Sequence, residues 1–296
     1  MSFFGSGHGA MHGAMHGAMH GAMSPAAGTF ITANQPLFRE HYETAFLSYP
    51  FHDDEVHPDY WALSKLPEIL RKLDPAADQY KDACANVENH LKAMANKAGL
   101  NYETDFDKVQ QLDIDYLTKT RFQNKLLEKA QIFDQSNSFH HYFVNVLSLN
   151  AQRQMTTLRL ISLATLVAGI VGMHWKLIHK RARPAQAMPG LFPLLPTPAH
   201  PSFPSNHATQ SYTVVNLLNM ALVGGQSSVA GQTLEKLAEN ISQNREWAGL
   251  HFRSDTKAGR ALAGPIADDL ASFDFVRDML TVSREELKHL ADPENE

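Results

Sequence analysis

The segment LISLATLVAGIVGMHW, residues 160–175, decides the fold class of this chain. It is the most apolar segment, and its length of about 16 residues falls short of the ~20 that span a bilayer comfortably. In the surrounding sequence, apolar residues recur at three- and four-residue spacing, whereas alternating β-branched residues are scarce. The segment therefore predicts a buried core helix in an all-α protein that has no transmembrane span.

The remaining sequence predicts a single-domain helical bundle. Helical patterns cover residues 61–73, 79–99 and 124–178, resume at about 207–224, restart near 229 and return over about 257–291. Seven prolines between 184 and 204 exclude a regular helix from that connection. No composition shift divides the chain after its N-terminal tail, so we expect one domain over residues 29–296, with the motif-bearing core at about 155–285.

The composition bounds the class of protein. A chain of 296 residues with 44% hydrophobic residues can bury a large core. Its net charge of −5 gives no reason to expect nucleic-acid binding or attraction to an anionic membrane. The single cysteine, Cys84, excludes an internal disulfide and is expected to be buried and inert. The N-terminus lacks a basic region followed by an apolar run, so we expect a soluble, cytoplasmic protein rather than an exported one.

The N-terminal residues 5–23, GSGHGAMHGAMHGAMHGAM, repeat the unit HGAM. Four histidines recur there at four-residue spacing: His8, His12, His16 and His20. On a helix they would form one ladder able to bind Zn, Ni or Cu. The interleaved glycines each cost a helix ~1 kcal/mol, which favours a disordered low-complexity tail over residues 1–28. Residues 52–59, HDDEVHPD, also resemble a metal site, but the pattern is more typical of a solvated loop and helix cap.

Residues that favour anions gather in the C-terminal half. Lys176 and Arg183 lie seven residues apart, which places them on one helix face if the helix continues that far. Ser205 stands before a helical pattern, where the backbone N–H groups of Asn206 and His207 and the helix dipole favour a negative charge. Both groups predict an anion site.

A third group follows in the sequence NREWAGLHFRSD. It carries Arg245, His251 and Asp255. If the chain is helical after His251, Asp255 lies one turn on and can select the tautomer of the imidazole. Singly, such residues are typical of a solvated helix end, an N-cap or a surface pair. Together, the cations, hydroxyl and amides match the demands of a tetrahedral or trigonal-bipyramidal oxyanion, and two histidines supply a nucleophile and an acid.

The order of these residues resembles the three-part signature of the type 2 phosphatidic acid phosphatase and vanadium haloperoxidase superfamily. The matching motifs are Lys176-x6-Arg183-Pro184, Pro204-Ser205-Asn206-His207 and Arg245-x5-His251-x3-Asp255. The resemblance covers about residues 176–260 and implies an all-helical fold with the active site at one end of a helix bundle.

Two positions depart from the family's pattern. Asn206 stands where the family usually has glycine, and Asn244 stands where it usually has serine. Because a backbone donor needs only its N–H, Asn206 is expected to narrow the pocket without abolishing anion binding. Asn244 can still donate or accept hydrogen bonds behind the site.

The resemblance implies an acid phosphatase that acts on phosphate monoesters without a metal or other cofactor. The phosphate would be held by Lys176, Arg183, Ser205, Asn206 and Arg245. His251, oriented by Asp255, would attack phosphorus to give a phosphohistidine. His207 would protonate the departing alkoxide and then activate the water that releases phosphate.

The same residues allow an alternative, a vanadium-dependent haloperoxidase. Vanadate would then be ligated by His251, and peroxide and a halide would be the substrates. The stretch HPSFPSNHATQ, residues 200–210, is also similar to bromoperoxidases, which place a histidine five positions before the motif serine, as His200 is here. Haloperoxidases are generally longer chains, so we favour the phosphatase. A third possibility is a non-enzymatic helical scaffold, in which the cations would not converge.

The substrate is left open by the sequence. His200, Phe203, Trp247, Phe252 and the loop over residues 185–204 are candidates for the entrance, although packing explains each aromatic equally well. A small-molecule phosphate ester is expected, and the resemblance suggests a homodimer.

Overall fold

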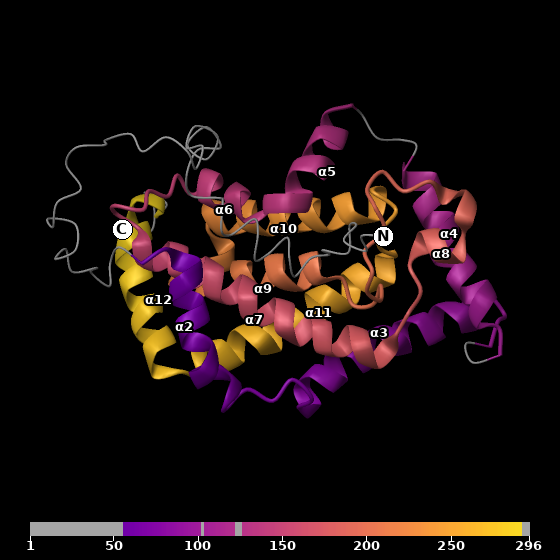
Figure 1. Ribbon diagram of the computed structural model, residues 1–296, viewed down its shortest axis with the longest axis horizontal. Coiled ribbons are helices and arrows are strands. Elements are labelled where there is room, and N and C mark those ends of the chain that lie inside the picture. The colour runs from indigo at the N-terminus through magenta and orange to yellow at the C-terminus, as the bar shows by residue number, and fades with distance from the viewer. Residues whose placement is uncertain (1–55, 102–103, 122–125, 292–296) are drawn as a thin grey trace, which may run out of the picture.

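The computed structural model describes residues 56–291, except for 102–103 and 122–125. Within that part of the chain, every regular element is helical (Figure 1). The α-helices are α2 (Pro58–Leu70), α3 (Asp78–Lys97), α4 (Phe106–Arg121), α5 (Leu126–Ser138), α6 (His140–Val146), α7 (Met155–His179), α8 (Pro184–Ala187), α9 (Asn206–Ala221), α10 (Val229–Trp247), α11 (Arg253–Ala271) and α12 (Asp274–Leu287). The predicted all-α single-domain bundle is therefore confirmed. The HGAM repeat, and with it the predicted tail over residues 1–28, lies outside the described residues.

Helix α9 is the centre of the bundle. It packs most extensively against α11, α7 and α10, and Figure 1 shows these helices running along the long axis of the molecule. Every residue from 202 to 215 is buried. Because the start of α9 is enclosed on all sides, its polar side chains must find partners inside the protein. Ser205 caps the helix as its pattern predicts, with Oγ accepting a hydrogen bond from the backbone N–H of Ala208 at 3.5 Å.

Helix α7 corrects one prediction made from the apolar run. The helix that contains the 16-residue apolar run is 25 residues long, from Met155 to His179. The stretch Met155–Ala187, which contains α7, is long and apolar enough to cross a membrane by length and composition, although 61% of its most apolar window is buried inside the protein. The expectation that the chain has no transmembrane span is thus wrong, because the sequence estimate counted only the uninterrupted apolar residues and left out both helix ends.

Several predicted helix boundaries also change. The single pattern expected over 124–178 divides into α5, α6 and α7, and the pattern expected over 257–291 divides into α11, α12 and a short 3-10 turn. Helix α4 was not among the predicted helices. The proline-rich connection holds only the four-residue α8 and a 3-10 turn at Pro189–Leu191, as the density of proline indicates.

Two smaller predictions concern local positions. Cys84 is buried, and burial raises the pKa of its thiol to about 12, in agreement with an inert residue. His57 is the N-cap of α2 and accepts a hydrogen bond from the backbone N–H of Asp59 at 3.4 Å. The described end of the stretch at 52–59 therefore contains a helix cap, as expected.

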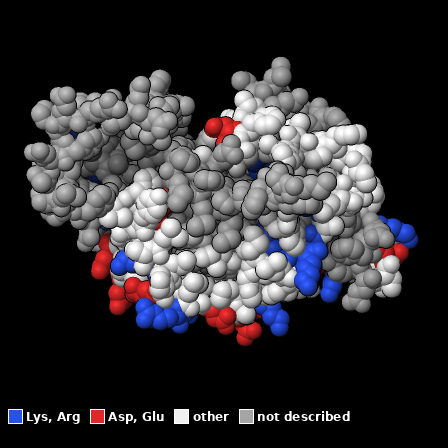
Figure 2. Space-filling view, viewed as in Figure 1, with Lys and Arg blue, Asp and Glu red and all other residues white. Residues whose placement is uncertain are grey.

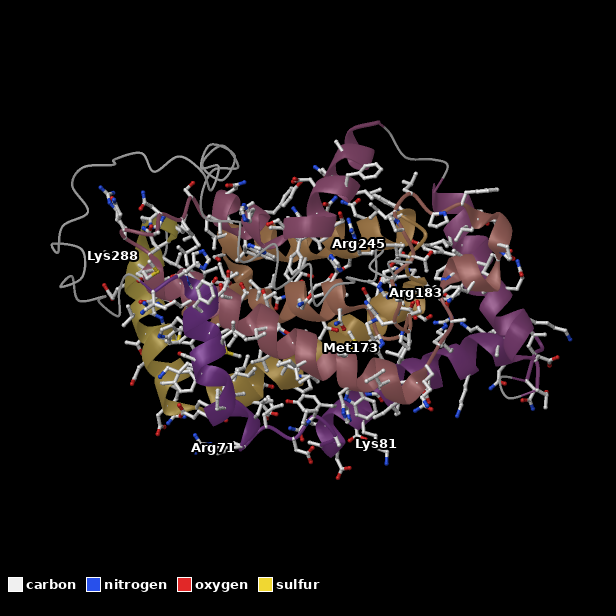
Figure 3. The ribbon with its side chains drawn as sticks, in the orientation of Figure 1. Arg71, Lys81, Met173, Arg183, Arg245 and Lys288 are labelled. Carbon is white, nitrogen blue, oxygen red and sulfur yellow. The ribbon has the colours of Figure 1, made fainter. Side chains whose placement is uncertain are left out.

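Acidic and basic side chains alternate along the lower edge of the visible face (Figure 2). In contrast, Arg183 and Arg245 lie inside the bundle in Figure 3, while Arg71, Lys81 and Lys288 lie at its margins. Both interior arginines are 1% exposed. Buried cations of this kind need a strong structural or chemical reason, since burial of a charge is costly.

Candidate active site

The candidate site lies where four chain segments meet. These are the C-terminal end of α7, the connection over residues 180–205, the N-terminus of α9 and the turn between α10 and α11. The condition for Lys176 and Arg183 to share one helix face is not met, because α7 ends at His179 and Lys180 adopts a left-handed conformation with φ of 50°. Both side chains nevertheless reach the same part of the proline-rich connection, since Lys176 donates to the carbonyl of Pro201 and Arg183 to the carbonyl of His200.

Lys176 is fully buried and directs its ammonium group at the proline-rich connection. Its Nζ donates to the backbone carbonyls of Pro201 and Ser202, both at 2.9 Å, and of Pro204 at 2.5 Å. An ammonium has three N–H donors, so all of them are used. Burial and the nearby Arg183 lower the pKa of Lys176, but three carbonyl acceptors stabilise the charged form. In this structure Lys176 holds the turn before α9 and places a positive charge beneath the site.

Arg183 joins the proline-rich connection to the turn before α11. Its Nε donates to the carbonyl of His200 at 3.0 Å, and its Nη1 donates to the carbonyl of Leu250 at 2.8 Å. Nη1 also lies 3.0 Å from Nε2 of His251, and Nη2 lies 3.1 Å from Nδ1 of His200. Because a guanidinium only donates, both imidazole nitrogens that face it must be acceptors. Burial lowers the pKa of Arg183 to about 10, so the group stays charged.

His251 and Asp255 form a buried pair. Nδ1 of His251 lies 3.2 Å from Oδ2 of Asp255, as the four-residue spacing allows. Since Nε2 accepts from Arg183, the proton of the neutral ring sits on Nδ1 and is donated to Asp255. Burial and the charge of Arg183 lower the pKa of His251 well below its usual value, so the imidazole is neutral near pH 7. A neutral ring with a defined tautomer is the form that a nitrogen nucleophile needs.

Asp255 is held by residues that the sequence motifs do not include. Arg181 donates to Oδ1 of Asp255 at 2.8 Å, and Ser202 donates to Oδ2 at 2.5 Å. Arg181 also donates to Oδ2 of Asp113 on α4 at 3.2 Å and to Oγ of Ser254 at 2.6 Å. Burial acts to raise the pKa of Asp255, but Arg181, His251 and Ser202 together bring it below its usual value.

Sequence reasoning missed this network. Arg181 belongs to none of the three motifs, yet its side chain is only 11% exposed. Its position two residues before Arg183 was the sole signal available, because Asp113 lies 68 residues earlier in the chain.

Arg245 and His207 meet helix α5. Arg245 Nη2 donates to the carbonyl of Ile132 at 2.6 Å, whereas its Nε and Nη1 are buried without a hydrogen-bond partner. Burial lowers the pKa of Arg245 to about 10. The imidazole of His207 packs against Phe139 with ring centroids 5.2 Å apart, and a hydrogen bond to the backbone of Gln135 favours its protonated form. Burial has the largest effect on the pKa of His207, and the positive charge of Arg245 has the second largest. Both lower it, so the pKa falls well below its usual value.

Asn206 does not narrow the anion site, contrary to the sequence interpretation. Its side chain points at α7, where Nδ2 donates to the carbonyl of Gly169 at 3.3 Å. A Cβ at Gly172 would lie 2.3 Å from Oδ1 of Asn206. The missing side chain of Gly172 therefore provides the space that Asn206 fills, and the backbone N–H of Asn206 stays at the helix N-terminus.

The predicted entrance residues separate into two groups. His200 lies at the Arg183 guanidinium, and its Nε2 is buried without a partner. Phe203 and Phe252 are 4% and 0% exposed, and Phe203 packs on His179 with ring centroids 4.7 Å apart. Both phenylalanines are thus core residues, while Trp247 is half-buried beside Ile132.

A cavity of about 240 Å³ lies elsewhere, between α2, α6 and α7. His57, His140, His141 and Ile161 are among the residues that line it, and it shares none of its lining with the candidate site. Among the described residues, no group of three or more His, Cys, Asp or Glu side chains is placed to hold a metal ion.

No protein-family model matches the sequence, and no curated protein matches it. Among solved structures, the chain is similar to the first transmembrane PAP2-type phosphatidylglycerolphosphate phosphatase from Bacillus subtilis. The TM-score is 0.45 and the sequence identity 15%, over 66% of this chain and 94% of that one. That protein is described as transmembrane. In this chain, the stretch Met155–Ala187 is long and apolar enough to cross a membrane by length and composition, which contradicts the expectation of a soluble, cytoplasmic protein.

Proposed function

We propose that this protein is a phosphatase that hydrolyses phosphate monoesters through a phosphohistidine on His251. The observation that carries the proposal is Arg245, whose Nε and Nη1 are buried near His207 without an acceptor. Buried donors that have no acceptor are costly, and phosphate oxygens would supply acceptors for them. With Arg183 and the backbone amides at the start of α9, these donors suit a tetrahedral oxyanion.

The tautomer of His251 defines the first step. Asp255 holds the proton on Nδ1, so Nε2 carries the lone pair that attacks phosphorus. Arg183 donates a hydrogen bond to Nε2 of His251 in this structure, and it would donate to a phosphate oxygen instead once the substrate enters. A P–N bond forms while the P–O bond to the leaving group breaks, and protonated His207 gives its proton to the departing alkoxide.

The second step returns the enzyme to its starting state. Neutral His207 accepts a proton from water, the water oxygen attacks phosphorus, and the P–N bond breaks. When the phosphate departs, the pKa of His207 falls again and the ring releases that proton to solvent. His207 is neutral before the substrate binds, since burial and Arg245 lower its pKa. The negative charge of the bound phosphate would raise that pKa and protonate the ring for the first step. In this scheme, buried cations supply the charge that metal ions provide in other phosphoryl-transfer sites.

A second candidate function, a vanadium-dependent haloperoxidase, is favoured by His200 alone. This histidine faces Arg183, and burial together with the charges of Lys176 and Arg183 lowers its pKa to about 3. Vanadate would occupy the same site against Nε2 of His251 and would supply the chemistry that activates peroxide. A phosphatase gives His200 no step of its own, so a specific need for His200 in halide oxidation would support this alternative.

One pair of assays separates the two functions. We expect purified protein to hydrolyse p-nitrophenyl phosphate, and vanadate to inhibit that hydrolysis as a mimic of the transition state. Bromination that depends on peroxide and appears only after vanadate loading would instead establish the haloperoxidase.

His207→Ala should slow hydrolysis most for alkyl phosphates and least for p-nitrophenyl phosphate, since nitrophenol leaves without a proton. Equal losses for both substrates would remove His207 from the acid role.

A further inference from the structure

Helix α5 contributes to the candidate site although it carries none of the three motifs. Its backbone accepts a hydrogen bond from Arg245 at the carbonyl of Ile132, at 2.6 Å, and its backbone at Gln135 lies close enough to His207 to favour the protonated form of the imidazole. These two contacts lie about one helical turn apart on α5. The position of α5 therefore sets where the guanidinium and the imidazole point.

The side chain of Gln135 is fully buried and fixes α5 to α10. Asn244 donates from Nδ2 to Oε1 of Gln135 at 2.8 Å, and Gln135 donates from Nε2 to Oδ1 of Asn240 at 3.1 Å. Asn244 also donates to Asn240 at 3.2 Å. The three amides form a closed set of hydrogen bonds, which we call the amide clamp.

The amide clamp explains why asparagine precedes Arg245. A serine hydroxyl at position 244 is shorter by one heavy atom and cannot supply two amide donors. Asn244 reaches both Gln135 on α5 and Asn240 one turn earlier on its own helix. Arg245 follows Asn244 directly. The amide that joins α10 to α5 is therefore next in sequence to the arginine whose guanidinium donates a hydrogen bond to α5.

Apolar contact around the clamp is small. Ile132 packs with Ala248 and Leu250 in a cluster separate from the main core of the described residues. Because this apolar cluster is small, burial of apolar surface stabilises the position of α5 only weakly, and the hydrogen bonds contribute more to holding it in place. A buried amide that loses its partner is costly, which makes the clamp sensitive to either substitution.

We propose that Gln135 and Asn244 are positioning residues that hold α5 so that Ile132 and Gln135 orient Arg245 and His207. The proposal rests on the proposed phosphatase function and names residues outside its motifs. Neither side chain touches the substrate in this scheme. Loss of the clamp should therefore reduce transition-state stabilisation and proton transfer rather than remove the nucleophile, and hydrolysis should persist at a lower rate.

The test compares Gln135→Leu, Asn244→Ser and the double variant with wild type. We expect Gln135→Leu to lower kcat for an alkyl phosphate about tenfold and for p-nitrophenyl phosphate less, because misplaced His207 matters most for a poor leaving group. Inhibition by vanadate should weaken severalfold through Arg245. The double variant should be no slower than Gln135→Leu alone, since both substitutions break one network. Gln243→Leu removes an exposed amide on the same helix and should match wild type.

Three outcomes decide the proposal. Wild-type kinetics in Gln135→Leu, or losses that multiply in the double variant, would overturn it. A uniform fall for both substrates with unchanged vanadate inhibition would indicate loss of folded protein only, and would also overturn it; circular dichroism and melting curves identify that case. Absence of hydrolysis in wild type would instead refute the phosphatase. In that case the rise in Tm on vanadate binding would still test the amide clamp. We expect this rise to be smaller in Gln135→Leu and unchanged in Gln243→Leu.

Discussion

Oδ2 of Asp255 lies 3.2 Å from Nδ1 of His251, and the same oxygen accepts the backbone N–H of Phe252 at 2.9 Å. Phe252 is the N-cap of α11, so one carboxylate both begins the helix and orients the imidazole. The geometry of the proposed nucleophile is therefore built into a helix start rather than into a mobile side chain.

His251→Ala is expected to abolish phosphate ester hydrolysis, because Nε2 is the atom that forms the covalent bond in the proposed scheme. The measurement is the rate of p-nitrophenol release. His289→Ala, at an exposed position near the C-terminal end of the described chain, provides the control and should retain wild-type activity. Unchanged turnover in His251→Ala would refute the role of this residue.

Acid should destabilise the protein through its buried histidines. Burial lowers the pKa of His140 to about 4 and of His200 to about 3, and the pKa values of His207 and His251 are also lowered. Below pH 6.5 the unfolded chain binds protons that the folded chain does not, so the free energy of unfolding falls as pH falls. Each such histidine contributes up to about 1.4 kcal/mol per pH unit between pH 6.5 and the folded pKa.

Urea denaturation at intervals from pH 7.5 to 4.5 measures this slope. His200→Asn should flatten it by the share of one histidine, whereas His289→Asn should leave it unchanged. A free energy of unfolding that is constant over this range would contradict the prediction.

The space between Asn206 and α7 can be tested by a double-mutant cycle. Gly172→Ala places a Cβ 2.3 Å from Oδ1 of the buried Asn206 side chain, so we expect a loss of about 1–3 kcal/mol of stability. In the Asn206→Gly background the clash is absent and most of that loss should disappear. Vanadate inhibition of Asn206→Gly should stay close to wild type, because the side chain points away from the anion site. Equal costs of Gly172→Ala in both backgrounds would show that the two residues do not share this space.

Arg181→Gln should destabilise the protein at neutral pH. The substitution leaves Asp255 and Asp113 without their buried cation, and breaking such a pair costs about 3–5 kcal/mol. The pKa of Asp255 lies below its usual value, so its ion pairs stabilise the fold above about pH 4 and are lost as pH falls further. The difference in unfolding free energy between wild type and variant should therefore narrow in acid.

The exposed pair of Arg277 and Asp274 supplies the matched control for Arg181. Arg277→Gln should change stability by less than about 1 kcal/mol, since exposed ion pairs contribute little. A loss in Arg181→Gln no larger than in this control would show that the buried network is not important for folding.

The sequence by itself determined what depends on neighbouring residues. The three- and four-residue apolar spacing predicted helices, Ser205 predicted the start of α9, and the spacing of His251 and Asp255 placed one beside the other. These features act within about one helical turn, so local chemistry is sufficient to predict them. The lengths of α7 and α5 were less predictable, because tertiary packing extends or divides an apolar pattern.

Only the tertiary structure decided how the buried donors and acceptors pair. It directed Lys176 at three backbone carbonyls, joined Arg181 to Asp113, turned Asn206 towards α7 and brought α5 to Arg245. Each partner lies at least 25 residues away in the chain. A buried polar group must find a partner wherever packing offers one, and that choice depends on long-range contacts that no local pattern contains.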